Sequence, residues 1–548
     1  MSQSVAIATA DPDLFAVIRA HLVSAGHPGI TDESLEPAPL ADCTIARDWL
    51  VGPNRVLLVI DAELPSGPTA SRDRSKRGEG VKQLHQDIDG TTFEATPRLV
   101  ITPSRGVYRE IEATCTRNRH AIALPMGQLH KHRQDILRPF LAMLLDKKIE
   151  GKIPGTFRVI EVDFGKMTSR CQLGFGQGPL LLWEASQRVD PLRKAAEIFD
   201  NESFYKSYRW PLVARQNGEL LFTDHVIEAL GEELFGHIED AAGGLEGLSF
   251  RYEITDESLY LAPFEASVRP ITERAGPFVL LKAPLARKLP ITATIRSTKA
   301  ANARMPTPTR ILAIRSQMGE HPDGPTTGDN YALVLPAPEG GGWRRRPAQF
   351  SRLDNIDVEL AALLDIADTR PNQLVLHVAD LSDMTERKPG ETAADYLGRK
   401  LKEHSYDVVH YAGHAWSDLN NEAHLILPGT ERGEASGLTL STFAAFPSLA
   451  ETRLVYLSAC RGISRGTVQT LVDYGIPHGI GFRYQVEDKK AAQFAETFYK
   501  ELFDGGFVPT AFCAACAAAR GRLLTDDESP IWLSPVLVAQ PADWAMRA

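Results

Sequence analysis

The sequence has no long apolar run, no cysteine framework and no excess of positive charge. It contains no stretch of about 18 or more apolar residues, so no membrane-spanning helix is expected. Its first residues lack the basic and apolar regions of a signal peptide. Six cysteines are scattered over 548 residues, unlike the dense framework of a small disulfide-bonded domain. These absences predict a reduced, cytoplasmic protein without a membrane partner.

The charge balance is acidic, with a formal net charge of -10. Proteins that bind nucleic acid as their main ligand need clustered positive charge to neutralise phosphates. Nucleic acid is therefore not expected as the main ligand. A local exception is Arg344-Arg345-Arg346, which we interpret as part of a solvated loop because glycine and proline flank it.

Residues 1–148 predict a small parallel α/β domain, because apolar strand-like runs alternate with helical segments. The expected strands are Ser4–Ala10, Arg55–Ile60, Arg98–Thr102 and Ala121–Leu124. The order resembles a response-regulator receiver domain, in which Asp61 would end the third strand. The last strand ends in Leu124-Pro125, where receivers have Lys-Pro. This difference favours a receiver-shaped interaction module, and phosphorylation at Asp61 is kept as a rival hypothesis.

Residues 150–300 mix strand-like and helical runs, and the segment Thr298–Thr309 is typical of a linker. From Arg310 onward, apolar strands alternate clearly with helices. The expected strands are Arg310–Arg315, Gln373–Ala379, Asp407–His414, Arg453–Ser458, Gly479–Val486 and Trp532–Ala539. This pattern predicts an α/β fold with a mainly parallel sheet flanked by helices. Gly319–Pro347 is expected to be a long loop, since it is rich in glycine and proline.

Two of these strands end in groups that could react. One closes on His414 and the other leads into Cys460, each after a small residue. Neighbouring parallel strands present their carboxyl ends at the same edge of a sheet, so the thiol and the imidazole are expected to meet there. An imidazole can raise the thiolate fraction of a cysteine and later protonate a leaving amine. The backbone N–H groups of Cys460 and Ala415 are candidate donors to the oxyanion.

The motifs around these two residues resemble a known family. Ser458–Gly462 reads S-A-C-R-G, close to the caspase pattern Q-A-C-[RQG]-G that has a histidine about 50 residues upstream. HYAGHA at His410–Ala415, with LSAC around the cysteine, resembles the CHAT family of caspase-like cysteine peptidases, relatives of caspases and separase. LAPFEA at Leu261–Ala266 and WLSPVLVA at Trp532–Ala539 match further family elements. The resemblance covers about residues 155–540.

The resemblance implies a caspase-like fold and three parts. Residues 1–148 would be a receiver-like regulatory or interaction domain, and residues 150–300 the N-terminal, pseudo-caspase-like part of the CHAT module. Residues 301–548 would be the caspase-like catalytic subdomain. Cys460 and His414 would then form the catalytic dyad of an endopeptidase that cleaves a partner protein, with a role in bacterial defence or programmed cell death. The N-terminal domain would sense a signal or bind a regulatory protein.

Substrate specificity stays open. Glu487 and Asp488 lie where an acid could bind a basic substrate residue, but acids also suit the start of the helix that follows. Arg461 could instead favour an acidic substrate. No cofactor and no metal are expected, because no cysteine or carboxylate cluster completes a ligand set around His410 and His414. The Cys513-x-x-Cys516 pair is interpreted as close helix packing.

One residue departs from the family pattern in a way that matters for activity. Ala415 follows the histidine, where the family has glycine, and the added methyl could crowd the oxyanion site. A caspase-shaped binding scaffold with little turnover is therefore kept as the alternative to the peptidase.

Overall fold

The structure is a computed structural model, and it consists of two compact units. Unit 1 comprises residues 1–161, 169–186 and 224–248, and unit 2 comprises residues 162–168, 187–223 and 249–548. The described residues are 4–25, 27–28, 30–66, 79–88, 96–102, 121–125, 141, 145, 159–164, 169–175, 178–184, 192–194, 210–260, 262–271, 276–292, 305–319, 330–336, 343–417, 422–459, 465–483, 486–505, 507–520 and 530–540. None of the described helices is long and apolar enough to cross a membrane.

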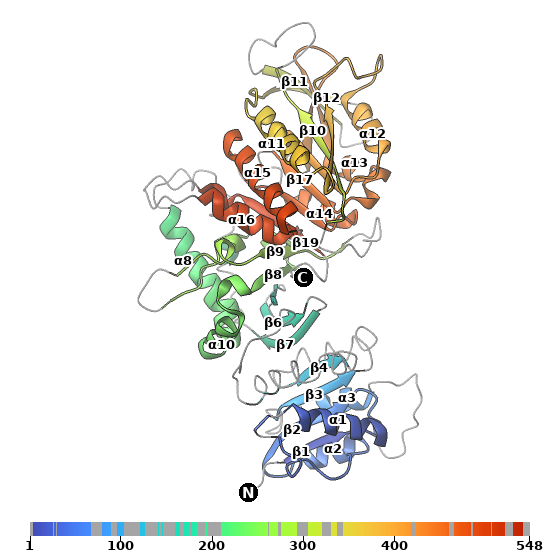
Figure 1. Ribbon diagram of the computed structural model, residues 1–548, viewed down its shortest axis with the longest axis vertical. Coiled ribbons are helices and arrows are strands. Elements are labelled where there is room, and N and C mark those ends of the chain that lie inside the picture. The colour runs from blue at the N-terminus through green and yellow to red at the C-terminus, as the bar shows by residue number, and fades with distance from the viewer. Residues whose placement is uncertain are drawn as a thin grey trace. The chain divides into compact units, whose positions relative to one another are not determined.

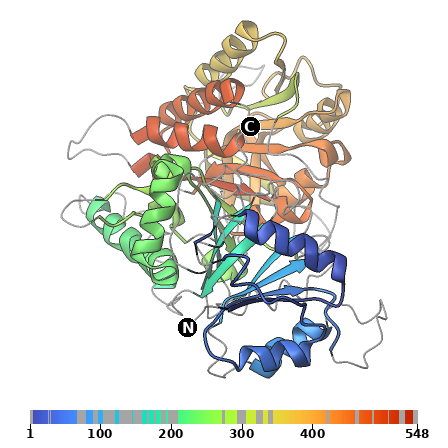
Figure 2. The same ribbon diagram turned by 60° about the horizontal axis from the view of Figure 1, so that its bottom comes forward.

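Unit 1 contains a four-stranded parallel sheet in the order β1-β2-β3-β4. Its strands are β1 (Ser4–Ala8), β2 (Arg55–Asp61), β3 (Arg98–Thr102) and β4 (Ala121–Pro125), and its helices are α1 (Pro12–Ser24), α2 (Cys43–Leu50) and α3 (Glu79–Ile88). Figure 2 shows α1 on one face of this sheet and α2 with α3 on the other. The four predicted strands are present and form a parallel sheet with helices on its faces, whereas the domain bounds of 1–148 and the likeness to a receiver stay predictions.

The helices of unit 1 begin where the sequence supplies caps. The side chain of Asp11 accepts backbone N–H bonds at the start of α1, where Pro12 occupies the first turn. Asp42 caps α2 in the same way.

The unit also contains a hairpin of β6 (Ser169–Phe175) and β7 (Gly178–Glu184), with helices α9 (Glu228–Leu230) and α10 (Glu232–Ala242).

Unit 2 is built on a sheet whose central strands follow the order β13-β10-β14-β17-β18-β19-β9-β8 (Figure 1). These strands are β8 (Ser249–Ile254), β9 (Leu285–Lys288), β10 (Thr309–Ser316), β13 (Leu374–Asp380), β14 (Val408–Ser417), β17 (Leu454–Ser458), β18 (His478–Phe482) and β19 (Pro535–Ala539). All neighbours are parallel except β18 and β19. The predicted mainly parallel sheet is confirmed.

Helices cover both faces of this sheet. They are α11 (Ile356–Thr369), α12 (Ala393–Glu403), α13 (Leu440–Ala444), α14 (Arg465–Asp473), α15 (Asp488–Gly505) and α16 (Val508–Arg520). The helix α8 (Trp210–Phe222) packs instead against Ala266, Val268 and Phe278. Residues of α12, α13 and α14 share one apolar core with β10, β14 and β17. Side chains of α11 and α15 contact β14 on the opposite face. Burial on both faces explains why the strands are continuous Val, Leu and Ile runs.

The expected long loop between Gly319 and Pro347 is partly wrong. It contains β11 (Asn330–Pro336) and most of β12 (Trp343–Gln349), which form an antiparallel pair. The alternating burial of β11, with Leu333 and Leu335 inside, accounts for the hairpin. The three arginines therefore lie in a strand rather than in a loop.

A second group of strands extends the sheet beyond His414. There β14 pairs antiparallel with β15 (Ala423–Pro428), β15 with β16 (Glu434–Thr439), and β16 parallel with β11. β14 thus continues to Ser417 instead of ending at His414, because β15 supplies a new hydrogen-bonding partner. Conversely, β18 ends at Phe482, short of the expected Val486.

Candidate active site

His414 lies where β14 changes partners. Its neighbours on the main sheet end just before it, with Gly413 opposite Ser316 of β10 and Ala412 opposite Ser458 of β17. His414 itself is the first residue of β14 to pair with β15, opposite Ile426. The imidazole is partly exposed, and its ring centroid lies 5.3 Å from that of Phe350. The side chain thus stands at the carboxyl edge of the parallel strands, as predicted.

A backbone carbonyl determines which imidazole nitrogen carries the proton. Nε2 of His414 lies 2.6 Å from the carbonyl oxygen of Ser351, in the segment between β12 and α11. A carbonyl can only accept, so Nε2 must donate and carries the hydrogen in the neutral ring. Nδ1 is then the nitrogen with the lone pair that can take a proton.

Gly413 allows a close contact that fixes the backbone of His414. The Tyr411 hydroxyl lies 2.8 Å from the carbonyl oxygens of both His414 and Ile426. A Cβ on Gly413 would lie 2.6 Å from that hydroxyl and 2.9 Å from Cβ of Ser316. Glycine is therefore needed for packing immediately before the histidine.

The segment that contacts His414 is itself held by a buried amide. Nε2 of Gln317 donates to the carbonyl of Leu353 at 2.7 Å, and Oε1 accepts from its N–H at 3.0 Å. Oε1 also accepts from the N–H of Met318 at 3.1 Å. Gln317 is fully buried, so these bonds fix the segment two residues from the Ser351 carbonyl.

A buried chain of polar groups links β14 and β17 under the same edge. The hydroxyl of Ser458 donates to Oε2 of Glu359 on α11 at 2.9 Å. Oε1 of Glu359 lies 3.0 Å from Nε2 of His410, whose Nδ1 lies 3.0 Å from the Tyr499 hydroxyl. His410, predicted only as a packing residue, is thus part of a network that ties both strands to α11 and α15.

The predicted nucleophile Cys460 and its neighbour Arg461 lie outside the described residues. The described part of β17 pairs with β14 in a parallel register, with Ser458 opposite Ala412. Cys460 follows Ser458 by two residues, just as His414 follows Ala412 by two. The pairing of Cys460 with His414 therefore stays a prediction.

The other predicted site residues are found in three places. Ala415 lies in β14 opposite Leu425. Asp488 begins α15, and its carboxylate accepts from the N–H of Asn355 at 2.8 Å and from its side-chain amide at 3.1 Å. Glu487 is mostly exposed and lies 3.2 Å from Lys490. Asp488 thus supports the start of α11, and the substrate-binding roles of both acids remain predictions.

The LAPFEA motif supplies a buried acid at the end of β18. Oε2 of Glu265 accepts from Nη2 of Arg483 at 2.6 Å, and Oε1 accepts from Nε of Arg287 at 2.9 Å. Burial alone would raise the pKa of Glu265, but the two guanidinium groups outweigh it and lower that pKa. Arg483 directly follows β18, so this cluster holds the chain at the end of that strand. β18 is the neighbour of β17, the strand that precedes Cys460 in the sequence.

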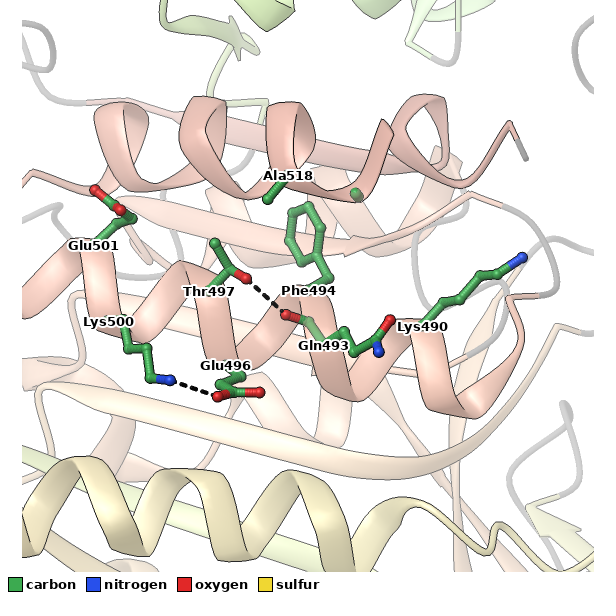
Figure 3. Close-up of a pocket in the computed structure, with 9 residues that line it drawn as sticks. Lys490, Gln493, Phe494, Glu496, Thr497, Lys500, Glu501 and Ala518 are labelled. Atoms are coloured by element: carbon green, nitrogen blue, oxygen red, sulfur yellow. Dashed lines mark hydrogen bonds and ion pairs between the residues drawn. The ribbon is translucent and has the colours of Figure 1, made fainter. Parts of the chain in front are cut away.

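A surface pocket of about 410 Å³ lies between α15 and α16 (Figure 3). Phe494 points toward α16, and Lys500 pairs with Glu496 at the rim. None of the residues that line it is a site residue predicted from the sequence. Cys513 and Cys516 are buried free thiols on α16, in agreement with their interpretation as packing residues.

Asp61 is the last residue of β2, the second described strand of the chain rather than the third, and its carboxylate is buried and engaged. Oδ2 accepts from the Thr9 hydroxyl at 2.8 Å, and Oδ1 accepts from the N–H of Glu63 at 2.9 Å. Burial raises the pKa of this carboxyl. These hydrogen bonds stabilise the turn after β2. This structural role explains an aspartate at position 61 without phosphoryl chemistry.

The profile of the CHAT domain family matches residues 227–547. No curated protein matches the chain. Among solved structures, the complex of Porphyromonas gingivalis RgpB pro- and mature domains aligns with a TM-score of 0.30 and 9% identity, over 56% of this chain and 70% of that chain.

Two structures of the Saccharomyces cerevisiae separase–securin complex align with TM-scores of 0.26 and 0.31, at 13% and 10% identity. They cover 58% and 87% of this chain, which spans only 18% and 38% of those chains. At such TM-scores none of these three likenesses carries an argument about function.

Proposed function

The chain belongs to the CHAT domain family, and from that premise we propose that it is a cysteine endopeptidase that cleaves a partner protein. Cys460 would act as the nucleophile and His414 as its base. The observation that supports this most directly is the 2.6 Å contact between Nε2 of His414 and the Ser351 carbonyl.

The reaction follows from this tautomer. Nδ1 of His414 takes the thiol proton, and the thiolate of Cys460 attacks the peptide carbonyl carbon. The oxyanion forms near the N–H groups of Ala415 and Cys460. Nδ1 then gives the proton to the leaving amine as the C–N bond breaks. Water hydrolyses the thioester and releases the acid, with His414 again as base.

The rival function is a binding scaffold with little turnover. The observation that favours it is Ala415, whose methyl group stands where the family pattern has glycine. The backbone N–H that would hold the oxyanion is unchanged by this methyl, so we favour the enzyme.

A peptide fluoromethyl ketone separates the two functions. Fluoride leaves as the Cys460 sulfur bonds to the methylene carbon, and the adduct is located by mass spectrometry. The enzyme predicts fast labelling of Cys460 that falls at least a hundredfold in His414→Ala. The matched control is His404→Ala, which removes an exposed histidine after α12 and leaves labelling unchanged. Slow, equal labelling of all six cysteines would refute the peptidase.

Residues 1–148 would regulate this activity by sensing a signal or binding a protein, as their receiver-like sequence suggests. Such a role fits a peptidase with one partner substrate, as in defence or programmed death. Deleting residues 1–148 should change the labelling rate of Cys460 if the unit is regulatory. An unchanged rate with and without a co-purified partner would contradict it.

A further inference from the structure

β12 is the outermost strand of the sheet in unit 2. It lies at one end of the strand order and, among the described residues, pairs with β11 alone (Figure 1). Nearly all of its residues are exposed, including Trp343, which is 69% exposed. A strand with one free edge offers backbone N–H and C=O groups to another extended chain.

The backbone of β12 can accept a partner over its first half. Proline is tolerated in edge strands where its missing N–H would face away from the neighbouring strand. With Pro347 in that position, alternation directs the N–H and C=O groups of Arg345 and Trp343 outward. An added strand can therefore pair over Trp343–Arg346 and must stop at Pro347.

The side chains of β12 make this edge strongly basic. Arg345 is paired with Glu434 at 2.9 Å. Within the part of the chain that the structure describes, Arg344 and Arg346 form no ion pair. The guanidinium of Arg346 lies 3.9 Å from the ring centroid of Trp416, which orders it while its N–H edges stay available to a carboxylate.

We propose that β12 binds an acidic, extended polypeptide segment by strand addition, with Arg344 and Arg346 contacting its carboxylates. The chain as a whole is acidic, with a net charge of -10, whereas this edge carries a cluster of arginines. Charge complementarity therefore selects an acidic occupant. Strand pairing selects a polypeptide over a nucleic acid, which has no backbone that fits a sheet edge. The strand that would bind this segment continues into Phe350 and Ser351, which contact His414.

Binding is measured without catalysis, so the proposal stands apart from the peptidase. The probe is a fluorescein-labelled dodecapeptide of alternating Thr and Glu, and its affinity for the full chain is read by fluorescence anisotropy. Charge reversal in Arg344→Glu/Arg346→Glu should weaken binding at least tenfold. The control Lys402→Glu/Lys489→Glu makes the same change in net charge at exposed helical positions and should leave the affinity within about twofold.

Two further probes test the mode of binding. A dodecapeptide N-methylated at alternate residues keeps its charge but cannot pair as a strand, so it should bind at least tenfold more weakly. Equal binding of both peptides, or tighter binding of single-stranded DNA, would overturn strand addition. No binding of the Thr-Glu peptide would also overturn it, and would leave the arginines and Pro347 as protection of an edge against aggregation.

Discussion

Replacing Glu265 by glutamine should destabilise unit 2 far more than removing an exposed acid. Glu265 is 1% exposed and pairs with Arg287 and Arg483, which are 0% and 2% exposed. Breaking a buried pair by removing one partner costs about 3–5 kcal/mol, because the remaining charge has no counter-ion. Here two guanidinium groups would lose theirs, so we expect a loss at the upper end of that range.

The chain offers a matched control on the adjacent residue of β9. Lys288 pairs with Glu253 at 2.7 Å, but both side chains are about 30% exposed, at 30% and 31%. Exposed pairs contribute about 0–1 kcal/mol. Glu253→Gln should therefore cost less than about 1 kcal/mol, and the difference between the two variants isolates the effect of burial.

The free energy of unfolding can be read in unit 2 alone. Cys513 is buried in α16, so its labelling by dithiodipyridine in a urea series, located by mass spectrometry, reports the opening of this unit. A loss of less than about 1 kcal/mol for Glu265→Gln, or one equal to that of Glu253→Gln, would refute the reasoning.

The pH dependence gives a second check on Glu265. Its pKa is lowered in the folded state, so its stabilisation is complete above the unfolded carboxyl pKa of about 4.3 and is lost as the pH falls through the folded pKa. The gap between wild type and Glu265→Gln should persist from pH 7 to pH 5 and narrow only in stronger acid. A gap that closes near neutral pH would contradict this sign.

Three further predictions follow from buried polar groups. Gln317→Leu should lower kcat for a peptide substrate at least tenfold, because it removes the two hydrogen bonds that hold the backbone at Leu353, near the Ser351 carbonyl. Ser351→Ala keeps that carbonyl and should leave kcat within twofold. Burial raises the pKa of the Cys516 thiol well above its ordinary value, so iodoacetamide at pH 8 should not modify it in the native protein, and mass spectrometry would show any adduct. Burial and then Arg98 lower the pKa of His85 to about 3; because the unfolded chain binds this proton below about pH 6.5, unit 1 should lose up to about 1.4 kcal/mol per pH unit below that pH. His85→Leu should flatten this slope, measured by urea exposure of the buried Cys43 thiol, and an unchanged slope would contradict it.

The fold of unit 2 could be predicted because its strands are buried on both faces. Continuous apolar runs such as those of β10, β14 and β17 are typical of parallel strands. All six strands predicted after Arg310 correspond to observed strands, with ends that differ by at most four residues. The β12 strand was missed because exposed arginines beside glycine and proline carry no alternation of apolar residues. The extension of β14 past His414 was missed because it depends on pairing with β15, which lies later in the chain.

The sequence predicted the reactive side chains of the candidate site, but not the backbone groups that contact them. His414 and its spacing to the cysteine stand out in the sequence, but Ser351 lies 63 residues earlier and contributes a carbonyl, which every residue has. No residue type at position 351 could indicate this role. The position of the Ser351 carbonyl depends instead on Gln317 and Asp488, whose side chains hold the backbone at Leu353 and Asn355.

Substitutions at Ser351 and at Gln317 should therefore affect His414 differently. A substitution at Ser351 leaves the hydrogen-bond acceptor in place, so the tautomer of His414 is insensitive to the side chain that touches it. A substitution at Gln317 should shift the acceptor, because it removes the two hydrogen bonds that hold Leu353, although Asp488 still holds Asn355. In the proposed peptidase, the position of the proton on His414 would therefore depend on Gln317, which follows β10 and makes two hydrogen bonds to the backbone of Leu353.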